Sequence, residues 1–525
     1  MPALSVIDLA MFLLETPERP FNIGPLVVLD PPARGRETFA DQLAARMSKR
    51  PLGTPFNYRL KSPLLGVPSL EVDPAADPAA HLHRITLPAP GTHEQLFTEV
   101  CTLHEARLDR SRLLWELYVI DGLEDGKVAV YGKAHHGIID GRTFVQVVSN
   151  WLATSPTDRT VRALWEGVPR RATRESAPRA SIAARLQGLL GNAAGTATSM
   201  VALYRMLGEQ GLKAIGVGGA QGLSLPFTGI PRALTGPASA KRSFAYSMLP
   251  IADMKAFGKA QGATLNDLLL ATLDIALDRY LQEQGVRLDK ALVAAMPVAL
   301  AGASGGNQIA ILQFPLGAPG KGPGARLAAV RAETAKVKGV VQKAAAETVM
   351  LYTTLVHGLP ALVEKVGLKR GLAVSNLIVS NPFGLPEKRY LMGAAVEVVL
   401  PISVVAAGQM LNVTAVTLDD RLQIGFLGIP EAVPAIDKLA RYVGDAFEAL
   451  KQSAAEVAPQ EDSPAARPRT ATKKTAKAAA KKVVRTPAKK TTRNTAIEPA
   501  ARSKKKRSPV KARAAAAHKP RPVKQ

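Results

Sequence analysis

The segment that most constrains this chain runs from residue 128 to 152, where an apolar run meets a heptapeptide with two histidines, an aspartate and two glycines, His135-His136-Gly137-Ile138-Ile139-Asp140-Gly141. The run Val128 to Tyr131 predicts a strand, and the apolar spacing of residues 142–152 predicts a helix that begins after Gly141. An imidazole at the end of a strand, with a carboxylate four residues on and a glycine to turn the loop, suits a general base that faces a cleft. Such a base could take a proton from an alcohol.

Other interpretations of the histidines stay open at this point. They can be an ordinary polar loop end, which needs no catalytic explanation. A zinc site is disfavoured, because adjacent histidines without a third ligand nearby have poor spacing for a metal, and His81 and His83 would join them only through the fold. A Ser-His-Asp hydrolase would need a serine on a strand-to-helix elbow. The chain has no G-x-S-x-G, and residues 302–306 have the wrong spacing and resemble a turn.

Strand-like and helix-like patterns alternate along the chain, which predicts an α/β fold. The first half has predicted strands at 26–29, 83–87 and 115–121, then the strand that contains 128–131 and enters His135, and helices at 38–50, 94–107 and 142–152. The second half has predicted strands at 244–249, 292–297, 309–315, 376–380, 394–400, 412–418 and 422–426 and helices at 251–261, 268–284, 325–338 and 432–451. Residues 156–240 are rich in Pro, Arg and Gly and form a crossover that is too long to be common inside one compact domain, so it separates two halves. We therefore expect an N-terminal half, a crossover, a C-terminal half and a tail at 1–155, 156–240, 241–452 and 453–525.

The charge of the chain is concentrated at its C-terminal end. Residues 463–525 hold 21 Lys and Arg against one acid, Glu498, so this segment carries +20 of the formal +25, and the preceding residues carry 47 − 42 = +5. The segment lacks the apolar residues that would offset ordering entropy, so we predict that it is disordered when free. It can bind polyanions, either nucleic acid or an anionic lipid surface, with strong salt sensitivity, or it can be a solvating extension. No aromatic side chain interleaves the charges for base stacking.

Cysteine usage and hydropathy bear on the cellular compartment. Cys101 is the only cysteine, so no intramolecular disulfide can form, and we expect it to be buried. Acidic residues interrupt the N-terminal apolar stretch, which argues against a secretory signal. The uncharged stretch Val398 to Leu418 contains polar residues and a proline between β-branched clusters and predicts two strands joined by a turn rather than a membrane span. Residues 186–204 resemble an interfacial or packing helix, so at most a peripheral membrane contact is expected.

The heptapeptide and further blocks along the chain resemble one family. These blocks are Leu4 to Asp8 with Phe12 to Pro17, Leu108 to Glu116, Asn266 to Ala271, Pro297-Val298, Gly306-Asn307 and Ser380 to Gly384. In this order they are similar to the bacterial wax ester synthase/diacylglycerol acyltransferases, a branch of the CoA-dependent acyltransferases that carry HHxxxDG. The chain departs from the family pattern at Leu113, which stands where a proline is usual, at Leu385, which intervenes before Pro386, and at Thr235, where asparagine is more frequent.

The resemblance implies a fold and a set of roles. It implies two chloramphenicol-acetyltransferase-like α/β sandwich halves that meet around a tunnel, with acyl-CoA as a co-substrate and neither cofactor nor metal. His136 would be the base that also returns the proton to the leaving thiolate, His135 would shape the site, and Asp140 would mainly hold the loop, through an arginine that the sequence does not identify. Gly141 would contribute to substrate binding.

Four further residues are candidates for contact with the substrate. Asn266 either donates its amide to the developing oxyanion or organises the tunnel wall, and it shares a helix start with Asp267, for which a helix cap is an equally good interpretation. Ser380 and Asn381 either line the acyl path and donate hydrogen bonds near the site or form an ordinary turn at a strand end.

Three hypotheses about function remain. The first is transfer of a long-chain acyl group from acyl-CoA to diacylglycerol or a fatty alcohol, which gives triacylglycerol or wax ester, in a cytoplasmic protein held peripherally on the inner membrane or on lipid droplets. The second is a condensation-type acyltransferase that takes acyl groups from carrier proteins, because the heptapeptide also occurs in such domains. The third is a noncatalytic lipid-granule or nucleic-acid-binding protein that acts through its basic tail.

Overall fold

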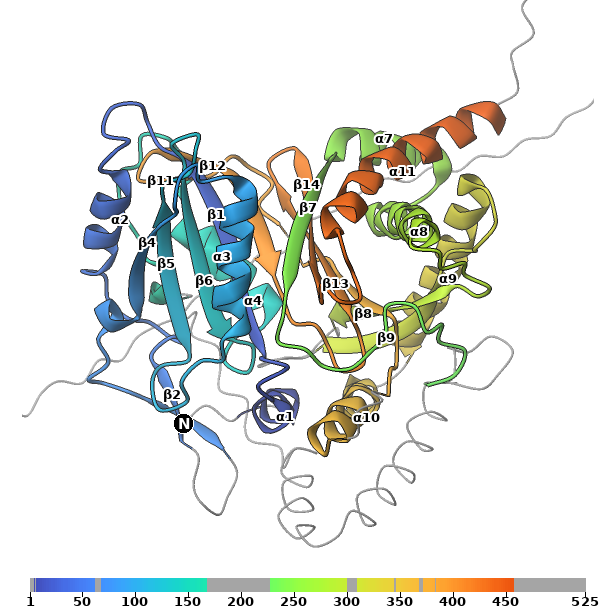
Figure 1. Cartoon of the computed structure of the whole chain (residues 1–525), viewed down its shortest axis with the longest axis horizontal. Helices are drawn as coiled ribbons and strands as arrows, with labels where there is room; N and C mark the ends of the chain where they lie inside the picture. Colours follow the sequence, from blue (N-terminus) through green and yellow to red (C-terminus); the bar gives the residue numbers. More distant parts are fainter. Residues whose placement is uncertain are drawn as a thin grey trace, which may run out of the picture. The chain divides into compact units, whose positions relative to one another are not determined.

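Two mixed sheets and the helices packed on them form the described part of the chain. The computed structural model describes residues 4, 6–61, 68–167, 227–299, 309–343, 346–367, 372–382 and 384–457. The N-terminal sheet has the strand order β11-β12-β1-β6-β5-β4, and the C-terminal sheet has the order β7-β14-β13-β10-β8-β9. The two sheets lie side by side (Figure 1). The predicted α/β class with two sheet-based halves is confirmed.

The elements are bounded as follows. The N-terminal sheet contains β1 (Asn22–Asp30), β4 (Leu82–Thr86), β5 (Trp115–Asp121), β6 (Val128–His135), β11 (Tyr390–Leu391) and β12 (Ala394–Ile402). The C-terminal sheet contains β7 (Ser243–Pro250), β8 (Leu292–Ala299), β9 (Ile309–Leu316), β10 (Leu377–Ser380), β13 (Leu411–Leu418) and β14 (Arg421–Gly428). The helices are α1 (Val6–Leu14), α2 (Phe39–Met47), α3 (His93–Glu105), α4 (Gly141–Trp151), α7 (Ile251–Gln261), α8 (Leu265–Glu283), α9 (Pro323–Lys343), α10 (Ala346–Lys365) and α11 (Ile436–Val457). A separate pair consists of β2 (Tyr58–Lys61) and β3 (Ser69–Val72).

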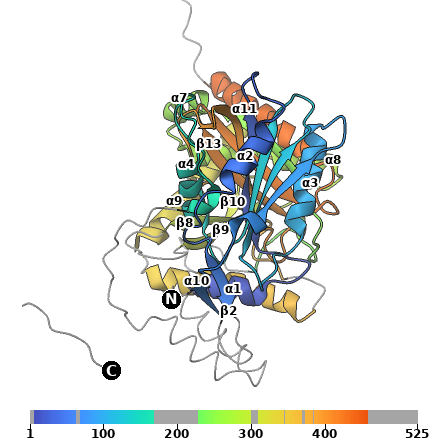
Figure 2. The same ribbon diagram turned by 90° about the vertical axis from the view of Figure 1, so that its left-hand side faces the viewer.

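Most predicted elements are found, with β5 and α7 at the predicted bounds. The closing helix differs: α11 begins at Ile436 because Ala435 before it has a left-handed φ of 48°, and it continues to Val457, inside the segment assigned to the tail. Sequence patterns missed α1 and α10, which pack together (Figure 2), and the short β2, β3 and β11. The predicted helix at 186–204, the predicted turn at 302–306 and the basic segment 463–525 lie outside the described residues.

A strand from the far end of the chain completes the N-terminal sheet. β12 pairs antiparallel with β1, with Leu400 opposite Leu26 and Val398 opposite Val28. The stretch from Val398 to Leu418 does hold two strands, as predicted, but β12 belongs to one sheet and β13 to the other. A cut at residue 241 therefore separates the sequence into halves without separating the sheets, because an alternating pattern predicts a strand but not its partner.

The hydrophobic core is continuous between the halves. Leu26 and Val28 of β1 pack in the cluster that contains the buried residues of α8 and α11, whereas Val27 and Leu29 pack on the other face of the sheet with α2 and α4. Successive side chains of a strand point to opposite faces, so the N-terminal sheet is buried on both. Cys101 is buried, as expected, and Trp115 is buried as well. No helix in the described ranges is long and apolar enough to cross a membrane.

Candidate active site

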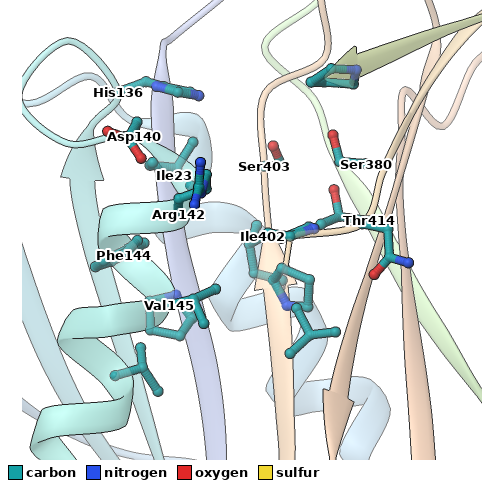
Figure 3. A pocket seen from close by; sticks show the side chains of 18 of the residues that line it. Ile23, His136, Asp140, Arg142, Phe144, Val145, Ser380, Ile402, Ser403 and Thr414 are labelled. Carbon is teal, nitrogen blue, oxygen red and sulfur yellow. The ribbon is translucent and has the colours of Figure 1, made fainter. Parts of the chain in front are cut away.

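Strand β6 delivers the heptapeptide to a cavity between the two sheets. All eight residues of β6 are buried, and the strand ends at His135. Next to this end, residues of both halves surround a cavity of about 370 Å³. Of the predicted site residues, six line this cavity, His136, Asp140, Gly141, Asn266, Ser380 and Asn381. His136, Asp140 and Arg142 lie on one wall, and Ser380, Ser403 and Thr414 lie on the other (Figure 3).

Burial favours the neutral form of the His136 ring. Its backbone N–H donates to the carbonyl of Phe21 (2.7 Å), which fixes the start of the loop beside β1. Its buried Nδ1 has no hydrogen-bond partner in the described part of the chain. Burial lowers the pKa of the ring, while its own backbone and the charges of Asp140 and Asp8 partly raise it. A neutral imidazole carries its proton on one ring nitrogen and can accept a proton through the other.

His135 supports the loop from behind and does not line the cavity. Its ring stacks on Phe12 with centroids 4.2 Å apart and planes 2° from parallel. Nδ1 accepts a hydrogen bond from the N–H of Gly137 (3.0 Å), so the proton of the neutral ring is on Nε2, 3.7 Å from Oε1 of Glu15. Burial first, and then the charges of Arg110 and His136, lower the pKa of His135 to about 3. This ring can shape the loop, as the resemblance implied, but it cannot reach a substrate.

Position 137 of the heptapeptide must be a glycine for steric reasons. A Cβ at Gly137 would lie 2.7 Å from Cε2 of Phe12 and 3.0 Å from Nδ1 of His135. Gly141 differs, because a Cβ there would meet nothing within 4 Å. The missing side chain of Gly141 therefore leaves open space in the cavity wall.

Asp140 holds the loop to helix α4. Its carboxylate accepts hydrogen bonds from the backbone N–H of Thr143 (2.8 Å) and from the hydroxyl of Thr143 (2.9 Å), which makes it the N-cap of α4. The resemblance implied an arginine in this role. In the described part of the chain the carboxylate bonds to Thr143, because a carboxylate directly before a helix satisfies the free N–H groups of the first turn.

Helix α8 brings Asn266 to the opposite wall. Nδ2 of Asn381 donates to Oδ1 of Asn266 (2.6 Å), so the amide nitrogen of Asn266 is left for the cavity, which Asn266 lines. Asp267, which we predicted to bind substrate, does not line the cavity. One of its carboxylate oxygens accepts from the N–H and hydroxyl of Thr264 (2.8 and 2.7 Å), and the other accepts from the hydroxyl of Thr334 (2.7 Å). Its role is a capping box and a tie between α8 and α9.

The remainder of the wall is mainly apolar and includes residues that sequence reasoning missed. Hydrocarbon side chains come from both halves, among them Ile23, Phe144, Val145, Met296 and Ile402. Such a lining favours an alkyl chain over a polar ligand. Ser403 and Thr414 were missed because neither belongs to a recognisable motif. Ser403 follows β12 and Thr414 lies within β13, and sequence patterns describe this stretch only as strands and a turn.

A second cleft of about 860 Å³ lies between α3, β7 and α11. It is larger than the cavity at His136, but it is lined by Cys101, Arg242 and Tyr246 and by none of the predicted site residues. The chemistry of the heptapeptide therefore belongs to the smaller cavity.

Family models and known proteins match this chain over most of its length. The family model described as wax ester synthase/diacylglycerol acyltransferase catalytic domain matches residues 4–269, and the WS/DGAT C-terminal domain matches residues 305–451. A probable diacylglycerol O-acyltransferase of Mycobacterium tuberculosis, Tgs4, is 31% identical over 469 residues, which are 87% of this chain and 98% of that protein. A putative diacylglycerol O-acyltransferase of Mycobacterium bovis is also 31% identical, over 86% of this chain and 100% of its own length.

Two solved structures share the fold. The wax ester synthase/diacylglycerol acyltransferase from Marinobacter aquaeolei VT8 superposes with a TM-score of 0.66 at 24% identity, over 87% of this chain and 100% of that chain. The first condensation domain of the CDA synthetase has a TM-score of 0.50 at 17% identity, over 86% and 96% of the two chains.

Proposed function

This chain belongs to the wax ester synthase/diacylglycerol acyltransferase family, and from that membership we propose that it transfers a long-chain acyl group from acyl-CoA to the hydroxyl of diacylglycerol or a fatty alcohol. The observation that carries the proposal is the neutral His136 at the wall of an apolar cavity between the two sheets. An alkyl chain fits such a lining, and a neutral imidazole fits the need for a base.

The reaction that we propose has two steps without a covalent enzyme intermediate. In the first, Nε2 of His136 takes the proton of the acceptor hydroxyl while its oxygen bonds to the thioester carbon, and the carbonyl electron pair moves to oxygen. In the second, the carbonyl re-forms, the carbon–sulfur bond breaks, and the CoA sulfur takes the proton from His136. One imidazole thus serves both proton transfers, and Asp140 and His135 hold its loop.

Product analysis tests the reaction. The full chain is given one labelled acyl-CoA together with hexadecanol and diacylglycerol in competition, and free CoA and neutral lipid are measured. We expect ester formation, and a loss of about 10²- to 10⁴-fold in kcat for His136→Ala, the range for removal of a general base. His93→Ala is the matched control, because His93 is exposed on α3 and should leave kcat unchanged. Full turnover by His136→Ala would refute the assigned base.

Two further arms of this assay address the alternatives. A carrier-bound acyl thioester replaces acyl-CoA, and a preference for it would favour condensation-type chemistry. Complete inactivity of the wild-type chain with every thioester and acceptor would favour a noncatalytic protein.

We also propose that the basic segment 463–525 places the enzyme on an anionic lipid surface. Its charge of +20 supports this, because each basic residue near such a surface contributes about 1 kcal/mol. Deletion of residues 463–525 should abolish salt-sensitive binding to vesicles that contain anionic lipid and leave esterification of a dispersed substrate unchanged. Loss of duplex DNA binding without loss of vesicle binding would assign the segment to nucleic acid instead.

A further inference from the structure

The segment after β12, residues 403–406, is held by an unusual set of hydrogen bonds. Nε2 of His104 donates to the carbonyl of Ser403 (3.0 Å), and Nδ2 of Asn412 donates to the carbonyl of Val404 (2.8 Å). Nη1 of Arg19 donates to the carbonyls of both Val405 and Ala406. Four consecutive carbonyls are thus fixed by buried side chains, although the segment belongs to neither sheet. Two of the three donors come from the N-terminal half.

The contact with His104 continues to the strand that carries the base. Nδ1 of His104 is 2.7 Å from the hydroxyl of Tyr131, which lies on β6 five residues before His136. The carbonyl of Ser403 can only accept, so the neutral ring donates through Nε2 and accepts from the Tyr131 hydroxyl through Nδ1. Burial lowers the pKa of His104 to about 3 and raises that of Tyr131, so both groups keep these roles at neutral pH. Strand β6 therefore ends directly before His136, and Tyr131 in the middle of this strand contacts the His104 ring that holds the carbonyl of Ser403.

The side chain of Ser403 is placed for contact with a substrate. It lines the cavity that holds His136, on the opposite wall (Figure 3). The hydrogen bond found for Ser403 in the described part of the chain uses its carbonyl, which leaves its hydroxyl to the cavity. The neighbouring hydroxyl of Thr414 is already committed, because it donates to Oδ1 of Asn412 (2.8 Å).

We propose that Oγ of Ser403 donates a hydrogen bond to the thioester oxygen as it becomes negative, and that His104 and Tyr131 are positioning residues that fix Ser403 opposite His136. The inference rests on the acyl transfer proposed above. Ser403 keeps its proton throughout: the carbonyl pair moves to oxygen when the acceptor attacks and returns when the carbon–sulfur bond breaks. A donor held by a rigid backbone stabilises the oxyanion without reorganising during the reaction.

Removal of the hydroxyl is the first test. For Ser403→Ala we expect kcat with acyl-CoA to fall about 10²- to 10³-fold, the range for loss of one oxyanion donor, with KM for acyl-CoA little changed. Ser48→Ala is the matched control, because it removes a hydroxyl that bonds to the carbonyl of Ala45 at the end of α2 and does not line the cavity, so kcat should stay within about threefold of wild type on the same scale. Equal losses in the two variants would overturn the specific role of Ser403.

A double-mutant cycle tests the positioning residues. Tyr131→Phe should lower kcat in the wild-type background and have no further effect in Ser403→Ala, because it acts through Ser403. The control is Tyr118→Phe on the adjacent strand β5. It removes a hydroxyl that bonds to Glu116 of the same strand, and it should act equally in both backgrounds. Additive effects of Tyr131→Phe and Ser403→Ala would show a merely structural tyrosine and overturn the positioning role. Because Tyr131→Phe leaves Ser403 itself intact, it also tests the network if Ser403→Ala fails to fold.

The outcome is separable from that of the proposed function. An inactive wild-type chain would refute the acyl transfer itself. An active wild type, an inactive His136→Ala and a fully active Ser403→Ala would refute only the role of Ser403.

Discussion

Acidification from pH 7 to pH 5 should destabilise this protein through two buried imidazoles. His104 and His135 are each 1% exposed, and burial lowers the pKa of both from the ordinary value of 6.5 to about 3. Between these values the unfolded chain binds protons that the folded chain does not. The stability that comes from the neutral rings is therefore complete above pH 6.5 and is lost as the pH falls from 6.5 towards 3.

The size of the loss follows from the proton balance. Each ring should cost about 2 kcal/mol of unfolding free energy between pH 7 and 5, so the pair costs about 4 kcal/mol. Asp274 acts in the opposite direction, because burial raises its pKa to about 6 and its folded carboxyl binds a proton first, which returns about 1 kcal/mol. Burial also lowers the pKa of His357 to about 4, which adds to the loss. A net loss of at least about 3 kcal/mol is large beside the usual stability of about 5–15 kcal/mol.

Urea unfolding at pH 7, 6 and 5 measures this dependence. His104→Gln keeps an N–H donor for the carbonyl of Ser403 and removes one titrating ring, so its loss between pH 7 and 5 should be smaller by about 2 kcal/mol. His93→Gln, at an exposed position on α3, is the control and should follow the wild type. The reasoning is refuted if the wild type is equally stable at pH 7 and 5, or if the two variants show the same pH dependence.

Three further changes have defined outcomes. Asp140→Ala removes the N-cap contacts with Thr143 and should lower the unfolding free energy by about 1 kcal/mol in urea titrations, whereas Asp140→Asn, an equally good cap, should retain it. Gly141→Val places a side chain in open cavity space, so the melting temperature should stay near wild type while KM for the lipid acceptor rises about tenfold or more in steady-state assays, because an occupied wall excludes substrate. Arg19→Met removes a buried guanidinium, leaves the partly buried Glu364 without its partner and frees two carbonyls. This should cost about 3–5 kcal/mol by urea unfolding, and a loss below about 1 kcal/mol would mean that the pair is screened.

Local patterns predicted much of this molecule. The period of apolar residues predicted β5 and α7 at their observed bounds, and the heptapeptide and the Ser380-Asn381 pair predicted residues that meet in one cavity although they are far apart in the chain. These successes depend on short-range signals or on a resemblance to whole blocks. They required no knowledge of which strands pair.

Long-range partners could not be predicted in this way. The pairing of β12 with β1 depends on which apolar faces meet in three dimensions, and an alternating pattern does not encode that choice. The same limit applies to single residues. Asp267 is a capping residue because Thr264 and Thr334 surround its carboxylate, and Ser403 faces the cavity because His104 holds its carbonyl. No motif in the sequence distinguishes these two residues from ordinary turn or helix positions.

The exchange of β12 into the N-terminal sheet has a consequence for synthesis on the ribosome. β1 is complete at Asp30, but its partner begins at Ala394, which is 394 − 30 = 364 residues later. At roughly 5–20 residues per second, the nascent chain waits roughly 20–70 s with one edge of β1 unpaired. An open apolar edge invites pairing with other chains during that interval. The N-terminal half therefore cannot mature as an independent unit, and a translation stall before residue 394 would release an aggregation-prone fragment.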